Sequence, residues 1–164
     1  MKTRRLTTMA VLMALGVVVG QLFYIPIGLA RIFPMQHLIN VIAAVLLGPA
    51  GAVANAFGIS VLRNLLGTGS LLAFPGSMIG AFLAGALYKR SSKISFAVAG
   101  ETIGTGVLGG LVAVPFAKVL MGKSLGTFAM VIPFLSSAIV GAVLGGLILS
   151  MSAFQARLRE WKED

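Results

Sequence analysis

Long apolar segments follow one another along nearly the whole chain, separated by short stretches that carry charged, proline or glycine residues. Segments of about 20 apolar residues are long enough to cross the hydrocarbon core of a bilayer. We therefore predict an all-α fold, a polytopic membrane bundle of six transmembrane helices in one domain spanning residues 1–164. The expected spans are residues 6–24, 34–47, 52–66, 74–88, 94–116 and 127–151, with a charged tail at 152–164.

Proline and glycine mark the predicted boundaries. Pro26 ends the first span, because proline disfavours helix at the residue before it. A loop of about residues 29–33 follows, and Pro34 suits the first turn of the second span. The run Gly48-Pro49-Ala50-Gly51 predicts a tight turn.

The least helical passage lies between the third and fourth spans, at residues 63–77. It combines an arginine, an asparagine, three hydroxyl side chains, three glycines and a proline. Irregular polar backbone at membrane depth survives only where protein buries it or where it lines a cavity. We therefore expect this segment to form part of the mouth of a small-molecule site.

Composition supports a membrane protein and excludes several other classes. The chain is 58% hydrophobic and 10% charged, whereas soluble domains carry about 25% charged residues. Its net charge of +9 lies at the ends of apolar segments, so we expect a lipid bilayer and no nucleic acid as partner. No phosphate-binding Gly-x-x-x-x-Gly-Lys motif occurs, so we expect no cofactor in this chain. Energy for transport would come from an ion gradient or from a partner that uses ATP.

The distribution of basic residues predicts the orientation. With six spans, both termini share one side of the membrane, and nine basic residues fall on that side against four on the other. This excess favours both termini in the cytoplasm of a multi-pass cell-membrane protein. The four on the outer side are Arg31, Arg63, Lys118 and Lys123.

Polar side chains near the expected outer ends of the spans are the best candidates for substrate contacts, because polar groups inside a membrane are costly. Gln36 and Asn40 are four residues apart and share a helix face. Phe33 and Phe74 can supply aromatic walls, although Phe74 suits simple packing as well, and Arg63 suits snorkelling to the interface as well as ligand contact. The full candidate set is Phe33, Gln36, His37, Asn40, Arg63, Asn64, Ser70, Phe74 and Ser77.

Glu101 is the only acidic residue before position 160. Asn55 enters the membrane from the same side to a similar depth, so we expect an Asn55–Glu101 hydrogen bond as a structural polar pair. A proton-coupling role for Glu101 is the alternative. His37 is the only histidine and has no acid expected at its depth, so we expect no catalytic residues, no enzyme and no metal site.

Two passages carry a resemblance to known proteins. Ala10-Val11-Leu12-Met13-Ala14 looks like the Ala-x-x-x-Ala motif with which substrate-capture S components of energy-coupling factor transporters dock on their coupling subunit. The passage Asn64 to Ala81, together with Pro34-Met35-Gln36-His37-Leu38-Ile39-Asn40, resembles the ThiW family over nearly the whole chain.

The resemblance implies an S-component-like bundle that takes up a thiamine precursor, the thiazole moiety hydroxyethylthiazole. It also implies three further subunits, namely a transmembrane coupling subunit that docks on Ala10 and Ala14 and two cytoplasmic ATPases. The ligand would lie in the outer half of the bundle under the loop at residues 25–34. The remaining alternatives are a phosphorylated thiazole, another vitamin, a self-contained ion-coupled carrier, and a membrane enzyme or scaffold.

Overall fold

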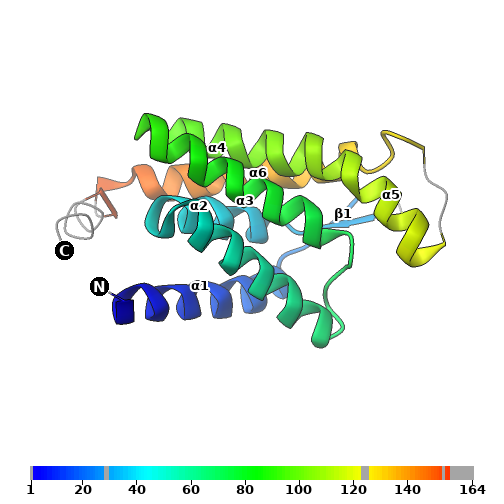
Figure 1. Ribbon diagram of the computed structural model, residues 1–164, viewed down its shortest axis with the longest axis horizontal. Helices are drawn as coiled ribbons and strands as arrows, with labels where there is room; N and C mark the ends of the chain where they lie inside the picture. The colour runs from blue at the N-terminus through cyan, green and yellow to red at the C-terminus, as the bar shows by residue number, and fades with distance from the viewer. Residues whose placement is uncertain (1, 28–29, 123–125, 153, 156–164) are drawn as a thin grey trace.

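The computed structural model describes residues 2–27, 30–122, 126–152 and 154–155. The described residues form a bundle of helices with one short hairpin (Figure 1). Helix α1 spans Lys2–Leu22, and strands β1 (Ile25–Ile27) and β2 (Ala30–Ile32) pair antiparallel. The other elements are α2 (Pro34–Leu65), α3 (Ala73–Ser91), α4 (Ile94–Glu101), the π-helical segment η1 (Thr102–Gly109), α5 (Gly110–Met121) and α6 (Val131–Ser150).

Helix α2 is bent back on itself at Gly48. This residue has φ of +73°, a conformation that favours glycine, and Pro49 follows it. In a straight helix Gln36 and Arg63 would stand about 40 Å apart, but their side chains are 2.6 Å apart. The chain therefore reverses at the predicted turn, and the two limbs of α2 match the ranges predicted as separate spans. Arg5 donates a hydrogen bond to the carbonyl of Leu47, the last residue before the bend.

The predicted all-helical class is confirmed, but the count of six spans is not. Four helices among the described residues are long and apolar enough to cross a membrane, namely Thr3–Leu22, Pro34–Leu65, Ile94–Leu120 and Val131–Ser150. The loop predicted at residues 29–33 instead contains strand β2.

Several predicted boundaries move outward. Helix α3 includes Lys89 and Arg90, which lie beyond the predicted end of the fourth span at residue 88. Helix α5 continues through Lys118 to Met121, beyond the predicted end of the fifth span at residue 116. Most of the predicted tail, and Arg31's side chain, lie outside what the structure describes.

Small residues set the closest helix contacts. A Cβ built on Gly104 would lie 2.7 Å from the Cα of Gly80, and one on Gly109 would lie 2.5 Å from the Cα of Gly76. Helix α3 therefore meets the α4–η1 helix backbone to backbone, as the spacing of small residues in both segments favours. Helix α2 packs against α1, α3 and α6 and forms the centre of the bundle.

The bundle has two distinct ends. The start of α1 and the end of α6 lie together at one end, and the β1–β2 hairpin lies toward the other (Figure 1). Helix α2 starts near the hairpin, and its second limb returns to that end, because Arg63 contacts Gln36. Polar residues of these segments are thereby gathered at the hairpin end.

The backbone contact between α3 and η1 predicts that Gly104→Ala destabilises the protein. The new Cβ would meet backbone atoms of Gly80, which cannot move aside as a flexible side chain can. Overpacking of this kind costs about 1–3 kcal/mol, which thermal unfolding in detergent will measure. Gly126→Ala is the matched control, since no atom lies within 4 Å of its Cβ position. Equal stability of the two variants would contradict the close contact.

Candidate functional site

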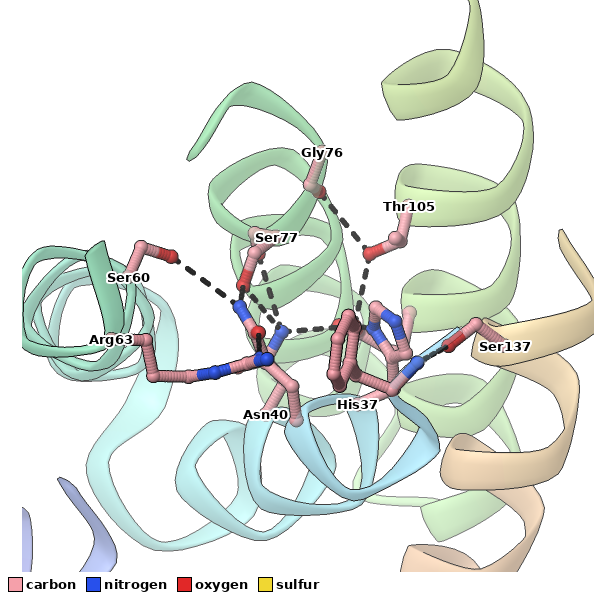
Figure 2. A network of polar contacts seen from close by, with 11 residues as sticks. His37, Asn40, Ser60, Arg63, Gly76, Ser77, Thr105 and Ser137 are labelled. Atoms are coloured by element: carbon pink, nitrogen blue, oxygen red, sulfur yellow. Dashed lines mark hydrogen bonds and ion pairs between the residues drawn. The ribbon is translucent and has the colours of Figure 1, made fainter. Parts of the chain in front are cut away.

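A network of buried polar side chains joins α2, α3, α4, η1 and α6 (Figure 2). Each helix contributes at its end nearest the hairpin or at mid-helix. The members buried to 3% exposure or less are Gln36, Asn40, Ser60, Arg63, Ser77, Glu101, Thr105 and Ser137. His37 is 8% exposed and completes the set.

The carboxylate of Glu101 is the centre of one half of this network. Its Oε1 atom lies 2.8 Å from Nδ1 of His37, 2.9 Å from Nδ2 of Asn40 and 2.9 Å from Oγ1 of Thr105. Glu101 is fully buried, and a Cβ on Gly80 would come within 2.8 Å of its Oε2 atom. The absence of a side chain at Gly80 therefore makes room for the carboxylate.

Arg63 is the centre of the other half. Its Nη1 donates to Oε1 of Gln36 at 2.6 Å and its Nη2 donates to the carbonyl of Thr68 at 3.1 Å. The guanidinium lies 4.2 Å from the centroid of the Phe33 ring, within the range of a cation–π contact. At 2% exposure, Arg63 faces the protein interior and does not snorkel.

Ser77 connects the two halves. Its hydroxyl oxygen accepts hydrogen bonds from Nε2 of Gln36 at 2.8 Å and from Nδ2 of Asn40 at 3.1 Å. Arg63 and Glu101 are thus linked through Gln36, Ser77 and Asn40 without touching each other (Figure 2). The shared face predicted for Gln36 and Asn40 brings both amides to the same serine.

Phe33 ties the hairpin to this site. Its backbone N–H donates to the hydroxyl of Ser137 on α6 at 3.1 Å. Its ring lies between Arg63 and Tyr24, whose ring centroid is 6.4 Å away. Phe33 is therefore held from two sides at the point where the hairpin meets α2.

The side chains of the remaining candidates do not bond the side chains of this network. Asn64 donates to carbonyls of Ser60 and Ser70, which fastens the turn after α2, and Ser70 is exposed. Phe74 packs edge-on against Phe57 at 5.9 Å, so it has the packing contact that was the alternative to a stacking role.

The expected Asn55–Glu101 hydrogen bond is wrong. Both polar atoms of the Asn55 side chain are buried without a partner, whereas Glu101 bonds His37, Asn40 and Thr105. The expectation that His37 has no acid at its depth is wrong for the same reason. Two side chains at the same depth do not meet when they lie on helix faces that pack against different neighbours.

Three network residues were not predicted, namely Ser60, Thr105 and Ser137. The signal that marks Thr105 is its place four residues after Glu101, beside the glycines that contact α3. Ser60 and Ser137 lie in apolar helices and no spacing distinguishes them from ordinary packing residues.

Together the fold and this interior network define a multi-pass helical membrane protein with the polar interior expected of a transporter for a small molecule. The family model of the thiamine-precursor transporter protein (ThiW) matches residues 6–154, and the chain belongs to this family. No curated protein and no solved structure matches the chain.

The unpaired amide of Asn55 predicts opposite effects for two matched substitutions. Asn55→Leu removes two buried polar atoms that have no partner, so we expect unchanged or higher thermal stability. Asn40→Leu removes the donor to Glu101 and Ser77, and we expect a loss of about 1–3 kcal/mol. Thermal unfolding of both variants in one detergent checks this. A larger loss in Asn55→Leu than in Asn40→Leu would contradict the assignment of partners.

Proposed function

We propose that this chain is the substrate-binding membrane subunit of an energy-coupling factor importer and that it captures hydroxyethylthiazole. Membership of the thiamine-precursor transporter family limits the substrate class. The observation that carries the proposal is the buried network at the hairpin end, which offers few polar groups beside aromatic rings. Sites for small aromatic ligands combine apolar walls with a small number of such groups.

Unpaired atoms of the network match a hydroxyl group. Among the described residues, Oδ1 of Asn40 and Nε of Arg63 are buried without partners. An alcohol can donate to the first and accept from the second. The Phe33 ring beside Arg63 supplies a flat surface for the thiazole.

The charges of the network favour a neutral substrate over a phosphate ester. Arg63 is linked through hydrogen bonds to Glu101, so the basic site has an acid within it. Both terminal nitrogens of Arg63 already donate hydrogen bonds. A phosphate would add uncompensated negative charge in a buried environment, which is costly.

The proposed partners are a transmembrane coupling subunit and two cytoplasmic ATPases. Ala10 and Ala14 are exposed on α1, while Gly16 and Gly20 of the same helix face Ile59 and Arg63 of α2. The alanines are therefore free to meet a partner helix. We propose a cytoplasmic location for both termini, in accord with the start of α1 and the end of α6 at one end of the bundle (Figure 1) and with the excess of basic residues that the sequence places on that side.

A self-contained ion-coupled carrier is the second candidate. The contact between His37 and Glu101 favours it, because a histidine beside a buried acid can relay protons. Uptake of thiazole into liposomes by this chain alone, driven by a proton gradient, would support the carrier over the importer subunit.

Substrate selectivity is the first prediction of the proposal. Purified protein should bind hydroxyethylthiazole at least about tenfold more tightly than its phosphate or thiamine, because burying an unpaired charge costs more than about 1.4 kcal/mol. The pyrimidine precursor, which carries no permanent charge, is the comparison for ring shape. Calorimetric titration measures all four ligands. Equal or tighter binding of the phosphate would overturn the neutral-substrate assignment.

Removing the linking hydroxyl tests the site itself. Ser77→Ala should weaken thiazole binding about three- to tenfold, since it deletes the acceptor that orients Gln36 and Asn40. Ser136→Ala is the matched control, because that exposed hydroxyl bonds only Ile132 of its own helix. Equal affinities of these two variants would place the ligand elsewhere.

Substitutions on α1 test the proposed docking of this chain on the coupling subunit. Ala10→Trp combined with Ala14→Trp should abolish uptake by the assembled transporter and leave thiazole binding to the isolated chain unchanged. Leu15→Trp, a change at an exposed position on another side of α1, is the control that should retain uptake. Normal uptake by the double variant excludes this docking surface.

A further inference from the structure

Glu101 is an acid enclosed in the bundle with a single ionisable neighbour in direct contact. The carboxylate is fully buried, and the side chain of its partner His37 is 10% exposed. The imidazole is therefore the member of the pair that reaches the surface of the bundle. His37 is the only histidine and Glu101 the only acid before residue 160, so the pair has no duplicate in the protein.

The hydrogen-bond pattern indicates how the pair holds its protons. Asn40 Nδ2 is a donor only, and Nδ1 of His37 and the Thr105 hydroxyl lie within hydrogen-bond distance of the same oxygen, Oε1. The single proton of the Thr105 hydroxyl is shared between Oε1 and the carbonyl of Gly76, 3.1 Å away. The Oε2 atom has no partner that would accept a proton from a carboxylic acid. The ligand-free arrangement thus fits a carboxylate that accepts from His37.

Among the side chains that the structure describes, the charged groups on the elements around the pair can be named. Arg63 supplies the compensating positive charge through Gln36, Ser77 and Asn40. Helix α3 presents Gly80 to Glu101, and α6 presents Gly141 to the Cβ of His37. Neither η1 nor α6 contains an ionisable side chain, and those of α3 are Tyr88, Lys89 and Arg90 near its far end.

Asn40 connects the proposed substrate position with the His37–Glu101 pair. Its amide donates to Glu101 and to Ser77, which lies between the two halves of the network. A substrate that draws this amide or the Arg63 guanidinium toward itself removes a donor or part of the compensating charge from Glu101. The carboxylate then holds a proton more tightly.

We propose that His37 and Glu101 form a proton-binding site whose occupancy rises when substrate binds. This inference rests on the proposed function, because it places the substrate at Asn40 and Arg63. The proton comes from solvent, enters by way of His37 and is retained by the pair. Linkage is reciprocal, so substrate affinity rises as pH falls.

Calorimetry of thiazole binding in buffers of different ionisation enthalpy measures this uptake directly. Wild-type protein should take up a fraction of a proton, up to about one, per bound hydroxyethylthiazole, and affinity should rise by up to about tenfold per pH unit as pH falls. Glu101→Gln should bind without proton uptake and with a flat pH profile. Glu160→Gln makes the same chemical change in the charged tail and should behave as wild type.

The outcomes separate the two hypotheses. Thiazole binding with an enthalpy that does not depend on the buffer overturns the proton site and leaves the proposed function intact. Proton uptake that persists in Glu101→Gln also overturns it. Failure of every thiamine precursor to bind overturns the proposed substrate instead.

If no thiamine precursor binds, a measurement without ligand still tests the proton site. The single histidine gives one set of ring signals in nuclear magnetic resonance of the wild-type protein. These signals should follow a different pH curve in Glu101→Gln than in the wild type, because the carboxylate bonds Nδ1. Identical curves in the two proteins, or no response in either, overturn the proposal whether or not a ligand binds.

Discussion

The interior of this bundle is organised by the need to satisfy one buried carboxylate. Glu101 has no exposed surface, and an unpaired charge in such a place would cost several kcal/mol. Donors reach it from the start of α2 and from η1, and α3 approaches closely enough to enclose it because Gly80 has no side chain. The close helix packing encloses Glu101, and the polar network supplies its hydrogen bonds, so both features serve to accommodate the buried carboxylate.

The second charge explains why the network extends beyond Glu101. Arg63 is also buried, and its hydrogen bonds to Gln36 and Thr68 leave it separated from the acid by two amides and a serine. A direct ion pair would hold both charges fixed. An indirect link keeps the sum of charges near neutral while leaving Asn40 and Arg63 with unpaired atoms, which is an arrangement suited to binding a neutral polar ligand.

Much of this could be predicted from the sequence. Hydropathy located the helices, Gly48 and Pro49 marked the reversal of α2, and the four-residue spacing of Gln36 and Asn40 placed both amides on one face. These features depend on local chemistry and helix period alone.

The partner of Glu101 could not be predicted, and the reason is geometric. Residue counting gives depth along a helix, and depth suggested Asn55, but rotation about the helix axis decides which faces meet. The second limb of α2 reaches the network through Ser60 and Arg63, while the first limb presents His37 and Asn40 to Glu101. The bend at Gly48 permits both limbs to contribute to one site. A glycine that reverses a helix thus brings Ser60 and Arg63 into the same network as the acid.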